Sequence, residues 1–285
     1  MASITNANTE SLTEEDIAIK EVRARITDVI AADAKFNDDL YLLQWLKAQK
    51  LNPEMAEGMI RKSIKWRQEQ NIHSNLHQVF DEDFLKEYFV PISKTKTGIP
   101  VVYVPVGSLN FKKAITKYGK NLWIKYWWMK CAQFEEEMIV FNKSQNRSNL
   151  KTLTSNSARG LVGLVNAKNF SSLQLLNLDV LRSSVEIAPA ITSEFPAVFE
   201  NLIFYNMNAV FKTIFVAVKP FLVGPGLTIE VYGSDEKIWR ERLLQIINLE
   251  DLQELENHRK QSSGLRNLEN SGPPIQTNCD GNQTQ

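Results

Sequence analysis

The chain has 285 residues, with 33 basic and 33 acidic side chains and 43% hydrophobic residues. This length and apolar content suffice for one or two packed domains. A net charge of zero gives no long-range attraction to phosphate backbones, and the sequence has no zinc-finger spacing or basic tract. The composition therefore argues against nucleic-acid binding.

The first residues are polar and lack the basic and apolar regions of a secretory signal, so we expect a cytosolic protein. Residues 1–12 are predicted to be disordered. The two cysteines lie in unlike settings, with Cys131 in an aromatic helix and Cys279 in a polar tail. We expect no disulfide between them, and Cys131 should be a reduced, buried thiol.

A helical lobe is predicted over residues 13–75. Residues 13–32 have apolar positions at helical spacing and acids at the front, which indicates a first helix. Asn37 or Asp38 is expected to cap the next helix. Asn52, followed by a proline, is typical of a further helix start.

A mixed domain is predicted over residues 76–256, followed by a disordered polar tail over 257–285. Four short apolar runs indicate strands: 99–107, 160–167, 201–207 and 227–233. Helical stretches separate them, over 120–141 and 175–191. This alternation favours an α/β fold with a mostly parallel sheet.

The segment 208–225 is nearly as apolar as a membrane span, but it is short and carries Lys212, Lys219 and Pro220. Such a helix can be buried in a core, lie at a membrane interface, or cover an apolar cavity and move. Likewise, the apolar face of 120–141 fits either core packing or a cavity wall. The spacing of residues leaves these alternatives open.

No hydrolase, zinc-protease or phosphate-loop motif is present in the sequence. His73 and His77 are four residues apart, but a metal site needs further ligands, so we interpret them as surface histidines. We therefore expect no catalytic residues, no metal and no cofactor.

Two motifs in the sequence resemble those of the CRAL-TRIO lipid-binding and transfer proteins, such as the alpha-tocopherol transfer protein and cellular retinaldehyde-binding protein. The first lies within the predicted helical lobe and is carried by Asp38, Asp39, Leu42, Leu43, Leu46, Ala48, Lys65, Trp66 and Arg67. The second lies in the mixed domain and is carried by Pro196, Asn206, Lys219, Pro220, Phe221 and Leu222. The resemblance covers about residues 12–250.

This resemblance implies an all-helical N-terminal lobe and an α/β lobe whose sheet floors an apolar pocket. It also implies that the apolar segment 208–225 is a gate helix that closes the pocket. Phosphatidylinositol-transferring members have a glutamate and an arginine where this chain has Ala197 and Val198. Members that unload on phosphoinositides have an arginine where this chain has Gln49. The family's strand aspartate is Asn166 here. The departures from the family pattern at Ala197, Val198 and Gln49 argue against a phosphoinositide ligand.

The predicted ligand-binding residues are apolar or aromatic and come from family position and strand or helix alternation: Tyr103, Trp127, Cys131, Phe134, Met138, Leu161, Val165, Leu173, Leu176, Ile187, Ile191, Leu202 and Phe204. The predicted gate and membrane residues lie on the apolar segment: Phe211, Lys212, Ile214, Phe215, Val218 and Lys219. The four apolar gate residues are expected to divide between the cavity and the outer surface.

The leading functional hypothesis is a non-enzymatic carrier that moves an isoprenoid, sterol, retinoid or carotenoid between membranes and docks transiently on their surfaces. The alternative hypothesis is an interaction module whose lipid cavity is filled and whose partner is a protein. An enzymatic function has no motif to support it.

Overall fold

The structure, a computed structural model, describes residues 12–72, 80–145, 152–174, 177–224 and 226–257. The two termini predicted to be disordered lie outside these ranges except for one residue each. His73, His77, Leu176 and Cys279 also lie outside them, so the predictions for these four residues are not addressed by the structure.

The N-terminal lobe is helical, as predicted. Its elements are α1 (Glu14–Arg25), α2 (Thr27–Ala32), the 3-10 helix η1 (Ala34–Asn37), α3 (Asp39–Ala48) and α4 (Pro53–Glu69). Asp38 caps α3 by accepting a hydrogen bond from the backbone N–H of Tyr41, and Asn52 caps α4 in the same way. The single helix predicted over 13–32 is wrong in one respect, because the chain breaks at Ile26, which has φ −114° and ψ 30°.

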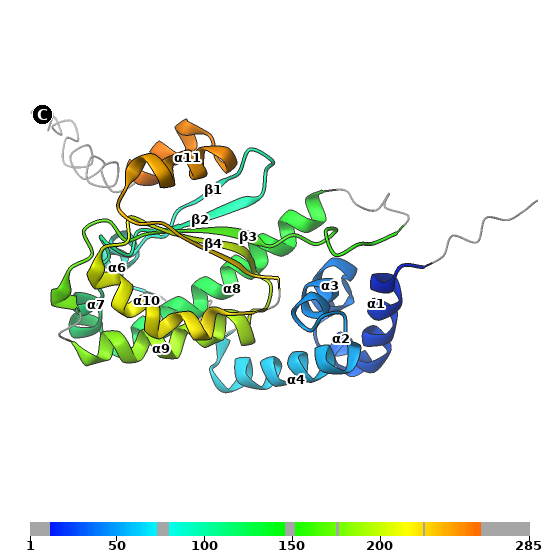
Figure 1. Cartoon of the computed structure of the whole chain (residues 1–285). Helices are drawn as coiled ribbons and strands as arrows, with labels where there is room; N and C mark the ends of the chain where they lie inside the picture. Colours follow the sequence, from blue (N-terminus) through cyan, green and yellow to red (C-terminus); the bar gives the residue numbers. More distant parts are fainter. Residues whose placement is uncertain (1–11, 73–79, 146–151, 175–176, 225, 258–285) are drawn as a thin grey trace, which may run out of the picture.

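A five-stranded sheet forms the centre of the second lobe (Figure 1). Its strands are β1 (Ile92–Lys94), β2 (Pro100–Val104), β3 (Leu161–Asn166), β4 (Phe199–Tyr205) and β5 (Thr228–Val231). Their order follows the sequence, with β1 antiparallel to β2 and the remaining pairs parallel. The mostly parallel sheet is therefore confirmed, with β1 as a strand that the sequence pattern did not predict.

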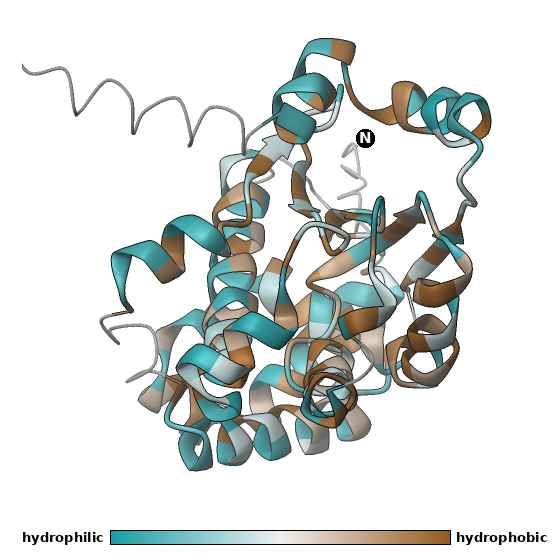
Figure 2. Ribbon diagram, turned by 90° about the vertical axis from the view of Figure 1, so that its left-hand side faces the viewer, coloured by the Kyte–Doolittle hydropathy of each residue, from teal (hydrophilic) through white to brown (hydrophobic). Residues whose placement is uncertain are grey.

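Helices cover both faces of this sheet. They are α6 (Glu82–Glu87), α7 (Phe111–Tyr118), α8 (Lys120–Ser144), the 3-10 helix η3 (Ser172–Gln174), α9 (Leu178–Ser193), α10 (Ala209–Leu222) and α11 (Glu236–Ile246). Figure 1 shows α8, α9 and α10 on one face and α11 on the other. Figure 2 shows hydrophobic colouring along the strands and mixed colouring on the helices, as expected for elements around a shared core.

A buried ion pair joins the helical lobe to the α/β lobe. Both terminal nitrogens of Arg67, on α4, donate to the carboxylate of Glu135 on α8, each at 2.7 Å. The hydroxyl of Tyr41 donates to the same carboxylate at 3.0 Å, and the Lys35 ammonium lies 3.4 Å from it. Arg67 also donates to the backbone oxygen of Glu194 at the end of α9. One guanidinium therefore holds α4 against both α8 and α9.

The electrostatic surroundings keep Glu135 ionised. Burial alone would raise the pKa of this carboxyl, but the charge and hydrogen bonds of Arg67, with Lys35 and Tyr41, outweigh burial and lower the pKa to about 2. A carboxyl whose pKa is lower in the folded than in the unfolded state stabilises the fold above its unfolded pKa. That stabilisation is lost as the pH falls from about 4.5 toward 2.

We expect Glu135→Gln to lower the free energy of unfolding by about 3–5 kcal/mol at pH 7, because it leaves Arg67 buried without a countercharge. The difference in unfolding free energy should shrink below pH 4.5, because protonation of Glu135 then begins to remove the same stabilisation from the native protein. Urea unfolding as a function of pH measures both effects. The double variant Arg67→Met with Glu135→Leu removes both charges and should recover much of the loss; a double variant as unstable as Glu135→Gln would contradict this account.

Candidate ligand cavity

An apolar cavity of about 200 Å³ lies between the sheet and helices α8, α9 and α10. Its wall consists of apolar and aromatic side chains with one serine: Val104, Val106, Phe111, Trp123, Trp127, Cys131, Phe134, Val165, Ser184, Ile187, Ala188, Ile191, Phe199, Leu202, Phe204, Phe211, Ile214, Phe215, Val218 and Leu222. No charged side chain occurs among these residues. The cavity therefore suits an uncharged, mostly hydrocarbon guest.

The sheet supplies the floor through strand alternation. Val165 on β3 pairs in register with Phe204 on β4, and both side chains face the cavity. Val104, the β2 neighbour of Val165, faces it as well. Gly163 stands on the same side two residues before Val165, and a Cβ there would meet Leu202 Cδ2 at 2.4 Å. A glycine at this position leaves room for the Leu202 side chain, which lines the cavity.

Helices α8 and α9 form the walls. Trp127, Cys131 and Phe134 recur at three- and four-residue steps along α8 and all line the cavity, so the cavity-wall interpretation of this helix holds for that part of its surface. On α9, Ile187 and Ile191 do the same. These five residues stand where the sequence predicted them, although their role in binding a ligand stays a prediction.

Helix α10 closes the cavity as a lid. Its cap residue Asn208 accepts a hydrogen bond from the Phe211 backbone N–H at 2.9 Å and donates to the backbone oxygen of Phe170 at 2.9 Å. The Phe211 ring packs on Phe170 with centroids 5.1 Å apart, and the Phe215 ring packs on Phe204 at 4.8 Å. Lid closure therefore rests mainly on aromatic contacts, with one capping side chain at the helix start.

The predicted division of the lid residues is wrong. Phe211, Ile214, Phe215 and Val218 all line the cavity, and the first three are buried. The outward apolar residues are instead Val216, which is 70% exposed, with Phe221 and Val223 at the C-terminal end of the lid. Lys212 and Lys219 are exposed, as expected for a polar stripe. The error arose because the helix is apolar on nearly every face, so composition did not indicate which side faces inward.

Polar groups in the wall are few and largely engaged. The Ser184 hydroxyl donates to the backbone oxygen of Val180 at 2.8 Å, as a serine within a helix commonly does. Cys131 is a free, buried thiol, as predicted, and burial raises its pKa to about 12. A thiol with so high a pKa is protonated at neutral pH and behaves as a small apolar group.

Four further predicted ligand residues do not reach the cavity. Tyr103 lies on the opposite face of β2, where its hydroxyl accepts a hydrogen bond from the Asn166 side chain at 3.0 Å. Met138 and Leu161 are buried in the core that joins the two lobes, and Leu173 is 64% exposed on η3. The Tyr103 prediction failed by one strand position, since its neighbour Val104 lines the cavity.

Several lining residues were not predicted, although some left a signal in the sequence. Trp123 precedes Trp127 by one helical turn, and Ser184 precedes Ile187 and Ala188 at the same spacing, so extension of the helical faces would have found them. Phe111, at the start of α7, had no such signal because α7 was not predicted.

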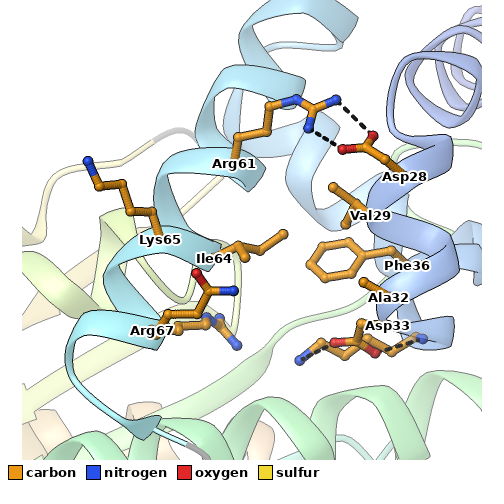
Figure 3. A pocket seen from close by; sticks show the side chains of 11 residues that line it. Asp28, Val29, Ala32, Asp33, Phe36, Arg61, Ile64, Lys65 and Arg67 are labelled. Atoms are coloured by element: carbon orange, nitrogen blue, oxygen red, sulfur yellow. Dashed lines mark hydrogen bonds and ion pairs between the residues drawn. The ribbon is translucent and has the colours of Figure 1, made fainter.

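A larger cavity, of about 430 Å³, lies in the helical lobe between α2, η1 and α4 (Figure 3). Its apolar floor includes Val29, Phe36 and Ile64, but its rim is charged. The rim cations are paired: Arg61 donates to the Asp28 carboxylate at 2.8 and 3.0 Å, and Arg67 is bound to Glu135. The smaller cavity is the candidate ligand site, because its wall is apolar and carries no charge.

Among the described residues, no helix is both long and apolar enough to cross a bilayer. Within the same ranges, no cluster of histidine, cysteine, aspartate and glutamate side chains has a composition and proximity suited to a metal ion. Both statements concern only the part of the chain that the structure describes.

The chain matches no protein-family sequence model. Comparison with solved structures finds Sfh5, known from a crystal structure, with a TM-score of 0.56 at 13% sequence identity. The match covers 84% of this chain and 85% of Sfh5. The likeness shows that the chain has the Sec14-like CRAL-TRIO fold. The fold implied by the two sequence motifs is thereby confirmed.

We expect Ile187→Trp and Ile191→Trp to reduce the amount of hydrophobic ligand bound by at least half, because each indole would occupy much of a cavity of about 200 Å³. Val185→Trp is the matched control, since Val185 lies on α9 but outside the cavity and is 38% exposed. Ligand stoichiometry, measured after a thermal melt confirms folding, tests the assignment. Equal stoichiometry in all three variants would contradict it.

Proposed function

We propose that this protein binds a small, uncharged hydrophobic molecule in the cavity beneath α10 and carries it through the cytosol between membranes, without catalysing a reaction. The observation that carries the proposal is an apolar cavity covered by α10, a helix that lines the cavity with apolar residues and also carries exposed apolar residues, Val216 and Phe221, on its outer side. The CRAL-TRIO fold adds support, because lipid binding and transfer are associated with that fold.

Loading of a larger molecule requires movement of the lid. The cavity of about 200 Å³ is below the roughly 300–1,000 Å³ of typical ligand sites. An isoprenoid, sterol, retinoid or carotenoid would have to displace Phe211 and Phe215 outward. These rings each contribute about 1.5–3 kcal/mol of burial, which a bound hydrocarbon of similar area can replace. Exchange of lid side chains for ligand is therefore energetically balanced.

The wall chemistry supports a ligand without a charged headgroup. Val198, at the position where phosphatidylinositol-transferring proteins have an arginine, is buried in the core at 1% exposure. Asn166 is engaged with Tyr103 and with the Asn206 side chain on the far side of the sheet. Neither position offers a cation to a phosphate group.

A second candidate function is a protein-interaction module with a filled cavity. The small volume favours it, because Phe199, Leu202 and the inward lid residues already occupy much of the space under α10. In this alternative the lid does not open, and the aromatic contacts of Phe204 with α10 are permanent core packing.

Organic extraction of the purified protein, followed by mass spectrometry, distinguishes the two candidates. A carrier should yield one hydrophobic molecule per chain or take one up from vesicles loaded with retinoid, sterol or carotenoid. A phosphoinositide at equal stoichiometry would overturn the ligand class but keep the carrier. A protein that neither yields nor takes up any of these molecules would favour the interaction module.

The outer side of the lid fits a membrane-docking surface. Val216, Phe221 and Val223 are exposed apolar residues at the C-terminal half of α10 and just beyond it, with Lys212 and Lys219 exposed nearby. Insertion of an apolar side chain into a membrane contributes more than the roughly 1 kcal/mol that a lysine adds near an anionic surface. Docking on this surface is therefore mainly hydrophobic.

We expect the double variant Val216→Ser with Phe221→Ser to weaken vesicle binding about tenfold or more and to slow ligand transfer, while ligand stoichiometry stays unchanged. The double variant Lys212→Gln with Lys219→Gln should have a smaller effect that disappears at high salt. Vesicle sedimentation and transfer between labelled vesicles measure both. A dominant lysine effect with strong salt dependence would contradict the hydrophobic docking surface.

A further inference from the structure

Helices α8 and α9 border a second cavity, of about 190 Å³, where α4 meets their far sides; it is distinct from the cavity of about 430 Å³ in the helical lobe. Its walls combine two indoles, two carboxylates and small or polar residues: Trp66, Gln70, Trp128, Glu186, Pro189, Ala190, Ser193 and Glu194. No lysine or arginine occurs among these eight residues. Helices α8 and α9 thus serve two cavities, one on each side.

The two cavities are separated by helical periodicity. On α8, Trp127 faces the apolar cavity and its neighbour Trp128 faces the second cavity. On α9, Ile187 and Ile191 face the apolar cavity, whereas Ala190 and Glu194 face the second one. An occupant of the second cavity therefore does not touch the proposed hydrophobic ligand, and the two sites can be tested independently.

Two buried polar atoms in this wall have no hydrogen-bond partner among the described residues. They are the indole Nε1 of Trp128 and the carboxylate Oε2 of Glu194. Trp128 is 7% exposed and Glu194 is 6% exposed. The other oxygen, Glu194 Oε1, accepts from the Ser193 hydroxyl at 2.9 Å. Unpaired buried donors and acceptors are costly, which points to a bound group that supplies the missing partners.

The nearby basic side chains do not supply those partners. Arg67 donates to the backbone oxygen of Glu194 and to the Glu135 carboxylate, and its guanidinium stacks on the Phe195 ring at 4.3 Å. Lys120 pairs with the partly exposed Glu186 at 3.1 Å. The Glu194 Oε2 atom is left as a buried acceptor that requires an N–H or O–H donor.

We propose that this second cavity binds a small protonated amine that also carries an oxygen atom, that is, an amino alcohol or a lipid headgroup of the same chemistry. Both atoms are buried, so we expect the Glu194 carboxylate and the Trp128 indole to turn toward the cavity on binding, where Glu194 Oε2 accepts from the ammonium N–H and Trp128 Nε1 donates to the oxygen. Trp66 packs edge-on against Trp128 with ring centroids 5.1 Å apart, and indole faces attract cations. Lys120 already pairs with Glu186, and the remaining carboxylate of the lining, Glu194, favours a cation over an anion.

The probe for the test is 2-aminoethanol, titrated into the full-length protein. We expect saturable binding by calorimetry and a shift of one indole N–H resonance, assigned to Trp128 by its absence in Trp128→Phe. Glu194→Gln keeps the shape but loses the charge and should weaken binding about tenfold or more. Glu137→Gln, an exposed position on α8, is the matched control and should bind as the native protein does.

Two further probes examine the chemistry. Tetramethylammonium has charge but no N–H donor, and ethylene glycol has oxygen but no charge; both should bind at least about tenfold more weakly than 2-aminoethanol.

Vesicles with phosphatidylethanolamine, compared with phosphatidylcholine vesicles, separate the two sources of the amine. A preference for the former that is lost in Glu194→Gln indicates a lipid headgroup, whereas binding of free 2-aminoethanol without that preference indicates a soluble amine.

The proposal is overturned if the native protein shows no saturable binding of 2-aminoethanol and no shift of the Trp128 resonance. It is also overturned if folded Glu194→Gln binds as tightly as the native protein, or if tetramethylammonium binds equally well. Should Glu194→Gln fail to fold, the resonance shift and the probe series on the native protein decide the matter. None of these outcomes bears on ligand uptake by the apolar cavity.

Discussion

The buried contact of Arg67 with Glu135 is the interaction on which the arrangement of the two lobes depends. It connects α4 to α8, and through the backbone oxygen of Glu194 it also fixes the end of α9. Isolated charges are expensive to bury, and here the cost is offset because the guanidinium and the carboxylate bond to each other and to further polar groups. Arg67 thereby holds α8 and α9, which form the walls of the apolar cavity, although Arg67 itself does not line that cavity.

Helices α8 and α9 carry different kinds of side chain on their two sides. Their inner faces, with Cys131 and Ile187, are apolar and face the sheet. Their outer faces, with Trp128 and Glu194, meet α4 in a small acidic and aromatic cavity. Because neighbouring positions on a helix point about 100° apart, single-residue steps are enough to separate these environments.

In the proposed carrier function, helix α10 is the element that would connect the cavity to a membrane. Its inner aromatic residues close the cavity, and its outer apolar residues, including Val216 and Phe221, remain exposed to solvent. A helix of this kind is tolerated in water only when one side is covered, and it gains stability from an apolar phase on the other side. A membrane offers such a phase, so under the proposed function docking on a membrane and opening of the lid would be coupled.

The sequence by itself determined the fold class and the positions of most elements. Strand alternation and helical spacing are local properties, so the sheet, the capped start of α4 and the existence of a broad apolar face on α8 could be predicted from residue order. The motifs around Arg67 and Pro220 extended this to the fold family.

Only the tertiary structure decided which side of each element faces the cavity. The sequence favoured Tyr103 over Val104 and divided the α10 residues between two sides, and both predictions failed because local pattern does not state what packs opposite. The unpaired atoms of Trp128 and Glu194 left no sequence signal at all, since their environment is assembled from three helices that are distant in the chain. Residue order specifies periodicity, whereas cavities and unmet hydrogen bonds arise from contacts between elements.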